Sequence, residues 1–109
     1  MKVVRLKPYI RAMRSMGLSD EAQTEIELMI VRAPEAHPMI RGLRGARKAR
    51  FPLPGRGKSG GGRTIYYVAV TLGVLFMMTA YPKNERDDLL PEQRKAILEA
   101  IASIKGVEP

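Results

Sequence analysis

The residues with the clearest chemical potential in this sequence are nine cations in a stretch that contains no acid. Every Asp and Glu of the chain lies outside residues 36–84. The cations inside that stretch are Arg41, Arg44, Arg47, Lys48, Arg50, Arg56, Lys58, Arg63 and Lys83. Like charges gathered on one surface repel each other, and solubility is better served by mixed signs. The segregation therefore favours a surface that binds the phosphates of RNA over an ordinary solvated face.

The rest of the composition argues against several other chemistries. The chain of 109 residues has a net charge of +8, no cysteine and a single histidine, His37. It therefore offers no disulfide framework, no thiolate nucleophile and no histidine-rich zinc site, and it disfavours a Ser-His-Asp triad. We interpret His37 as a surface loop residue, since no second His or Cys supports it. Glu85, Asp87 and Asp88 fit a solvated loop better than a metal site, so we expect no cofactor.

The glycine-rich segment 55–62 raises the question of a nucleotide-binding P-loop. Gly57, Lys58 and Ser59 match the end of the motif, but the first glycine of the motif falls at Pro52. A strand is expected after this segment, so no helix N-terminus faces a phosphate there. We therefore interpret Arg56 and Lys58 as part of a basic loop that lies along a nucleic-acid backbone.

The elements that must position these cations are those of a small α+β domain spanning residues 1–109. We expect strands at 3–6, 46–51, 63–70 and 74–81, with a short turn at 71–73 between the last two. We expect helices that begin near Pro8, Ser19 and Pro91 and end near Gly17, Pro34 and Gly106. Strand alternation places Lys48 and Arg50 on one face of the sheet, and it sends the adjacent Tyr66 and Tyr67 to opposite faces.

The apolar segment 64–80 is short for a membrane span and is rich in β-branched and aromatic residues. Gly73 divides it where a turn is expected, so a buried hairpin fits better than a membrane helix. The first residues are charged throughout and contain no apolar core of a secretion signal. We therefore expect a cytoplasmic protein with no membrane partner.

Several segments together resemble the RelE/HigB toxins of type II toxin–antitoxin systems, within the RelE/ParE superfamily. They are LR at 43–44, RKARF at 47–51, LPGRGKSGG at 53–61, RTIYY at 63–67 and AYPKNE at 80–85. The order of elements also matches: a strand, two helices, an antiparallel sheet and a last helix. The resemblance implies a RelE-like fold, with a small antiparallel or mixed sheet packed against two N-terminal helices and a C-terminal helix.

The same resemblance implies a ribosome-dependent endoribonuclease that cuts mRNA in the ribosomal A site. It also implies a cognate antitoxin, often with a helix-turn-helix domain, and no small-molecule ligand. In such an enzyme the RNA 2′-hydroxyl attacks the adjacent phosphate, and clustered Lys and Arg can orient the strand and stabilise charge without metal. A lysine among other cations gives up its proton more readily, so such a cluster can also supply a base.

By analogy with this family, four residues are the expected catalytic set. Arg63 would bind the scissile phosphate, and Lys48 or Lys83 would act as the base, with Lys48 favoured. Arg50 and Lys83 would otherwise stabilise charge or protonate the leaving oxygen. The expected RNA-binding residues are Arg41, Arg44, Arg47, Arg56, Lys58, Tyr67 and Tyr81. Some RelE toxins place a tyrosine near the last helix, but this chain has none at 87–90. Either that role is lost here, or Tyr81 or Tyr67 covers part of it.

Two other functions remain open from the sequence. A ParE-like relative that poisons DNA gyrase would use the same fold, but the cations lie where the ribonuclease branch needs them. A non-catalytic RNA-binding module would show salt-dependent binding without cleavage.

Overall fold

The computed structural model describes residues 1–53, 61–85 and 88–108 of the chain. Within these ranges the chain forms four strands, β1 (Lys2–Arg5), β2 (Arg47–Phe51), β3 (Gly62–Ala69) and β4 (Val74–Pro82). The helices are α1 (Lys7–Ser15), α2 (Asp20–Arg32) and α3 (Pro91–Val107), together with the short 3₁₀ turn η2 (Val70–Leu72). The expected strands and helices are all present, with ends shifted by a few residues at most.

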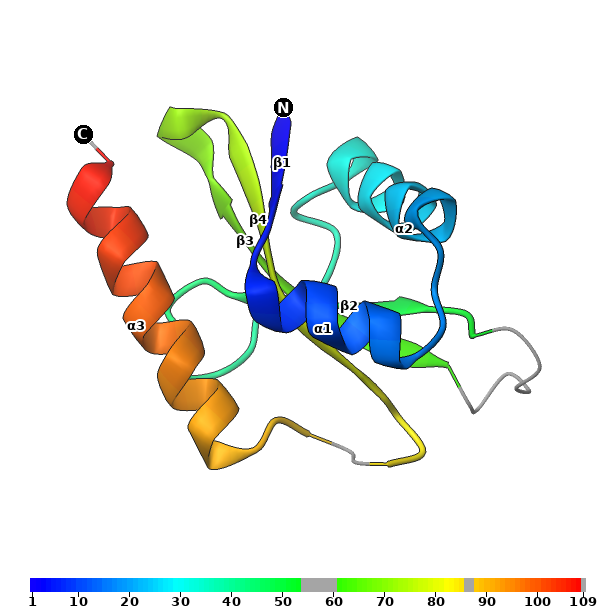
Figure 1. The fold of residues 1–109 in the computed structure, drawn as a ribbon. Helices are drawn as coiled ribbons and strands as arrows, with labels where there is room; N and C mark the ends of the chain where they lie inside the picture. The colour runs from blue at the N-terminus through cyan, green and yellow to red at the C-terminus, as the bar shows by residue number, and fades with distance from the viewer. Residues whose placement is uncertain (54–60, 86–87, 109) are drawn as a thin grey trace.

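The four strands form one mixed sheet in the order β1-β4-β3-β2. The pairs β2–β3 and β3–β4 are antiparallel, while β1 pairs with β4 in parallel. Helices α1 and α2 lie on one side of this sheet and α3 lies on the other (Figure 1). The expected α+β architecture is therefore confirmed, including the mixed sheet and the three helices.

Local signals explain where several elements begin and end. The Ser19 side chain accepts a hydrogen bond from the backbone N–H of Ala22, which caps the start of α2. The connection between β3 and β4 is the 3₁₀ turn η2, followed by Gly73 at φ 65°. A left-handed conformation favours glycine, and this one reverses the chain into β4.

Two apolar layers cover the two faces of the sheet. Under α1 and α2, buried side chains such as Tyr9, Met13 and Ile30 pack with Tyr66 and Met77. Under α3, a second cluster contains the buried residues Leu43, Ala46, Ile65, Tyr67, Ala69, Met78, Tyr81, Leu89, Ile97 and Ile101. Because α3 covers the second face only in part, side chains near one end of the sheet stay accessible on that face.

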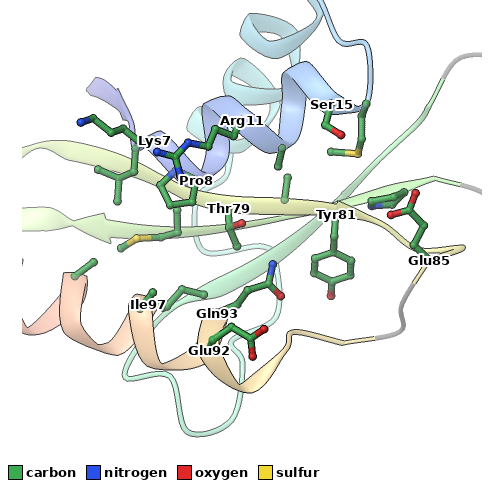
Figure 2. A pocket seen from close by; sticks show the side chains of 18 residues that line it. Lys7, Pro8, Arg11, Ser15, Thr79, Tyr81, Glu85, Glu92, Gln93 and Ile97 are labelled. Carbon is green, nitrogen blue, oxygen red and sulfur yellow. The ribbon is translucent and has the colours of Figure 1, made fainter.

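A groove of about 750 Å³ opens between α1 and α3, with β4 residues such as Thr79 and Tyr81 on its floor (Figure 2). Its α1 wall carries Lys7 and Arg11, and its opposite wall carries Glu85 and Glu92. Opposite charges thus face each other across an otherwise largely apolar surface, which is a poor match for a polyanion. None of the four expected catalytic residues lines this groove.

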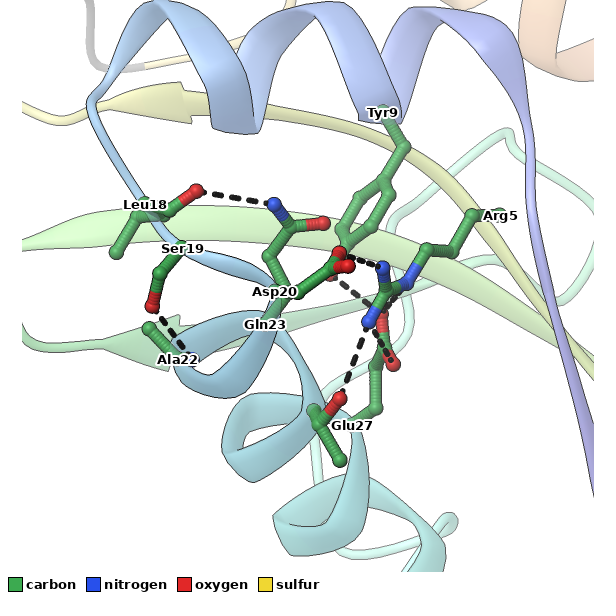
Figure 3. Close-up of polar contacts among 9 residues, drawn as sticks. Arg5, Tyr9, Leu18, Ser19, Asp20, Ala22, Gln23 and Glu27 are labelled. Atoms are coloured by element: carbon green, nitrogen blue, oxygen red, sulfur yellow. Dashed lines mark hydrogen bonds and ion pairs between the residues drawn. The ribbon is translucent and has the colours of Figure 1, made fainter.

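A buried ion pair attaches α2 to the start of the chain (Figure 3). The Arg5 guanidinium donates to both carboxylate oxygens of Glu27, at 2.8 and 3.1 Å, and also to Asp20 at 2.7 Å. The Tyr9 hydroxyl donates to Glu27 at 2.8 Å. Burial and this carboxylate both raise the pKa of Tyr9 above its ordinary range. Glu27 is thus a buried charge whose partners come from β1 and α1, so it fixes α2 against both.

Gly62 lies under the ring of Phe51, across the β2–β3 pairing. A Cβ at residue 62 would come within 2.2 Å of Phe51 Cζ, so Gly62→Ala is expected to push the ring out of its site. We expect a loss of about 1–3 kcal/mol in the free energy of unfolding, measured by urea denaturation. Gly106→Ala is the matched control, because a Cβ there enters open space. If Gly62→Ala unfolds at the same urea concentration as Gly106→Ala, the close packing is not as described.

Candidate nucleic-acid interface

Three strands bring Arg50, Arg63 and Tyr81 into one row across the sheet. Arg50 is the register partner of Arg63, and Arg63 is the register partner of Tyr81. Side chains directly opposite each other on neighbouring strands share a face, and Tyr81 belongs to the apolar layer under α3. Arg50 and Arg63 therefore lie on the α3 side of the sheet, next to the part that α3 leaves uncovered.

Lys48 lies on the same face as Arg50, because the two residues are separated by one position in β2. The strand rise places them about 7 Å apart along the strand. Lys48 is half-buried and Arg50 is exposed. Lys48 and Arg50 therefore share a face of the sheet, as strand alternation predicts.

Lys83 lies at the same end of the sheet as Arg50 and Arg63. It directly follows β4, and its backbone N–H donates to the carbonyl of Gly61 at 3.0 Å. Arg63 lies two residues after Gly61, and its Nη1 donates to the carbonyl of Gly62 at 3.0 Å. Of the four expected catalytic cations, Lys48 and Arg50 therefore lie in β2, Arg63 near the start of β3, and Lys83 directly after β4.

Among the described residues, no carboxylate forms an ion pair with Lys48, Arg50, Arg63 or Lys83. In the part of the chain that the structure describes, the ion pairs join Arg5 to Asp20 and Glu27 on the opposite side of the sheet. Two arginines in direct register repel each other, which is a cost to the folded protein. A bound phosphate would relieve that repulsion, so the row has the electrostatics of an anion site.

Arg47 does not join the other cations. Its Nη1 donates to the backbone carbonyls of Glu35 and His37, at 3.1 and 2.8 Å, and strand alternation sends it to the face opposite Lys48. In the structure Arg47 thus holds the loop that follows α2, and its role in binding RNA stays a prediction. Arg41 and Arg44 are exposed before β2, as an RNA contact requires. Arg56 and Lys58, with the rest of the glycine-rich loop, lie outside the described residues.

The tyrosines expected to stack on bases are buried in the structure. Tyr67 is 8% exposed, and its hydroxyl donates to Glu108 at 2.8 Å beneath the end of α3. Burial, with help from this hydrogen bond, raises the pKa of Tyr67 to about 12. Tyr81 is 2% exposed. Both rings belong to the apolar layer under α3, so stacking on a base would require them to become exposed, and their role in binding RNA stays a prediction.

Tyr66 is also a core residue, on the other face of the sheet. Its hydroxyl donates to the carbonyl of Pro34 at 2.5 Å, and the rings of Tyr66 and His37 pack in a T-shaped arrangement. Burial raises the pKa of Tyr66 to about 12. The prediction that Tyr66 and Tyr67 point to opposite faces of the sheet was correct, and both side chains are packed in the core.

No family model matches this chain. Among solved structures, it is similar to an arginine-to-alanine double mutant of the E. coli toxin RelE in the free state. The two share 17% sequence identity with a TM-score of 0.57, over 92% of this chain and 96% of that one. The chain has the RelE fold. The expected RelE-like architecture is thus confirmed across nearly the whole length of both proteins.

On this RelE fold a second hollow, of about 840 Å³, opens beside Lys48. It is lined by Pro38, Met39, Ile40, Arg41, Gly42, Lys48, Asp88 and Arg94. Sequence reasoning missed Arg94, because it lies on a helix of mixed charge far along the chain from Lys48. Its place in the site follows only from the packing of α3 against the loop before β2, where Arg94 Nη2 donates to the Arg41 carbonyl at 2.8 Å.

The RelE-fold chain shows neither a metal cluster nor a membrane helix in its described part. Residues 1–53, 61–85 and 88–108 hold no group of three or more His, Cys, Asp or Glu side chains placed to bind a metal ion. Over the same ranges, no helix is long and apolar enough to cross a bilayer.

Proposed function

We propose that this protein is the toxin of a toxin–antitoxin pair and acts as a ribosome-dependent mRNA endoribonuclease. The observation that carries the proposal is the unneutralised Arg50–Arg63 pair, in register across β2 and β3, with Lys48 on the same face. The RelE fold and the acid-free stretch 36–84 support the same function. In cells the partners are mRNA in the ribosomal A site and an antitoxin, which we expect to carry a helix-turn-helix domain, and the site of action is the cytoplasm.

In the proposed reaction, Lys48 takes the proton of an RNA 2′-hydroxyl, and the 2′-oxygen attacks the adjacent phosphorus. The bond from phosphorus to the 5′-oxygen breaks, which leaves a 2′,3′-cyclic phosphate and a 5′-hydroxyl. Arg63 binds the phosphate oxygens, where negative charge grows in the transition state. Arg50 and Lys83 add positive charge at the same end of the sheet, and one of them protonates the leaving oxygen. The step needs no cofactor.

The experiment that tests this function is expression of the protein in bacteria, followed by mapping of mRNA 5′ ends. We expect growth arrest together with new 5′-hydroxyl ends at the ribosomal A site, and no cleavage of the same transcript when ribosomes are absent. Trapped gyrase–DNA complexes without cut mRNA would instead support a ParE-like gyrase poison. RNA binding that weakens steeply with salt, without any cleavage, would support a non-catalytic RNA-binding module.

A further inference from the structure

The hollow beside Lys48 has the composition of a nucleotide subsite. We propose that it holds the nucleotide next to the scissile phosphate, and that Asp88 favours bases carrying an exocyclic amino group there. This inference rests on the proposed function, because it assigns a neighbouring nucleotide to the same site. The hollow lies next to the Arg50–Arg63 row, because Lys48 lines the hollow and shares a face of β2 with Arg50.

The apolar part of the hollow offers a surface for a base. Met39 is 62% exposed although it is a large apolar side chain, and Ile40 and Pro38 lie beside it. Backbone hydrogen bonds fix this loop against the edge of the sheet: Lys48 N–H donates to the Pro38 carbonyl, and Ile40 N–H to the Ala46 carbonyl, at 3.0 and 2.8 Å. A flat base packed on this fixed surface would cover apolar area that is otherwise in water.

Three cations surround that apolar surface from separate parts of the chain. Arg41 lies in the loop, Lys48 in β2 and Arg94 in α3. The position of Arg94 is defined, because Nη2 donates to the Arg41 carbonyl and a Cβ at Gly42 would lie 3.4 Å from it. Cations around an apolar floor match a nucleotide, whose base is apolar on its faces and whose phosphates are anionic.

Among the described residues that line this hollow, Asp88 is the one acid. Its carboxylate can contact a base but would repel a phosphate. Its Oδ1 accepts the backbone N–H of Leu89 at 2.7 Å, which fixes the carboxylate. A carboxylate accepts several hydrogen bonds and donates none, so it pairs with the amino groups of adenine, cytosine and guanine. Uracil has no amino group, and its one base N–H, at N3, lies between two carbonyl oxygens that repel a carboxylate, so we expect the site to disfavour uracil by about tenfold.

The first test follows binding alone, so it does not depend on cleavage. Protein labelled at methionine methyl groups is titrated with fully 2′-O-methylated oligo(A), oligo(C) and oligo(U), which cannot be cleaved. We expect the Met39 signal to shift with oligo(A) and oligo(C) at about tenfold lower concentration than with oligo(U). Met1 is 56% exposed and distant in sequence, so its signal is the internal control and is expected to stay unchanged.

The second test changes the wall of the hollow. Asp88→Asn is expected to remove the discrimination against oligo(U), while Glu99→Gln, an exposed acid on α3, keeps it. Arg94→Gln is expected to weaken all three oligonucleotides alike, whereas Lys95→Gln, the next residue of the helix, changes binding only slightly. In cells, Asp88→Asn is expected to spread cleavage to sites with uracil while Glu99→Gln keeps the original cleavage sites.

The outcomes separate the subsite from the proposed function. If the protein cuts ribosomal mRNA but the Met39 signal does not shift with any of the three oligonucleotides, the subsite proposal is wrong and the proposed function stands. A base-selective Met39 shift in a protein that cuts no mRNA supports the subsite and overturns the nuclease. Equal binding of oligo(U) and oligo(A) by the unmodified protein overturns the selectivity assigned to Asp88.

Discussion

Replacing Arg63 and Lys48 together with alanine is expected to abolish the growth arrest that the unmodified protein causes. Arg63 is in register with Arg50, and Lys48 lies on the same face, so the double change removes the phosphate contact and the base at once. Losing one charge-stabilising donor costs a factor of about 10²–10³ in rate. Losing a positioned base costs a similar factor. We therefore expect mRNA cleavage to fall at least about a thousandfold, measured by the yield of cut transcript on ribosomes.

The control for this double variant is Arg14→Ala with Lys2→Ala. It removes the same two kinds of charge from exposed positions on α1 and β1, away from the row. The net charge of the two variants is identical, so a general loss of attraction to RNA would affect both equally. A double variant that stays fully toxic while folded would show that Arg63 and Lys48 are not the catalytic residues. Matching thermal unfolding curves would confirm that both variants are folded.

Glu27→Ala is expected to lower the free energy of unfolding of the protein by a large amount. The carboxylate is 6% exposed and accepts from Arg5 and from the Tyr9 hydroxyl. Removing it leaves the buried Tyr9 hydroxyl without its acceptor and leaves Asp20 as the remaining carboxylate beside the Arg5 guanidinium, which costs about 3 kcal/mol. For a domain of this size that corresponds to a fall of roughly 10 °C or more in the melting temperature, measured by circular dichroism.

Glu25→Ala provides the comparison for this prediction, because Glu25 is an exposed acid on the same helix. It is expected to change the melting temperature by a degree or two at most, since surface substitutions lie within about 0.5 kcal/mol. Tyr9→Phe keeps the ring and loses one hydrogen bond, so it should fall between the two. If Glu27→Ala melts together with Glu25→Ala, the ion pair does not anchor α2 as described.

The sequence was sufficient for those parts of the site that depend on neighbours along the chain. Lys48 and Arg50 share a face because strand alternation is local, and Ser19 caps α2 because the capping residue and its partner lie within one turn. The pairing of Arg50 with Arg63 could not be derived this way. It depends on the register of two strands joined by a long glycine-rich segment, and a shift of one residue would send each side chain to the other face.

Contacts between distant elements account for what the sequence could not predict about these side chains. Tyr67 lies on a strand and looked available for stacking, but the last turn of α3 covers it, and its hydroxyl donates to Glu108. Arg47 is one of the nine cations of the acid-free stretch, but its guanidinium donates to two carbonyls of the loop after α2. Arg94 gave no signal, because nothing in a mixed-charge helix shows which cation meets the loop before β2. In each case the partner is set by tertiary packing.

The parallel pairing of β1 with β4 has a consequence for how the protein is made. The first strand of the chain is held by residues 74–77, and the core under α1 includes Leu75 and Met77 from that same late strand. As the chain leaves the ribosome, β1 and the first two helices have no sheet to pack on until β4 emerges. The sheet can therefore form around β1 only after β4 has emerged, and Lys83 directly follows that strand. A chain interrupted before Val74 would lack both the partner of its first strand and one of its proposed catalytic residues.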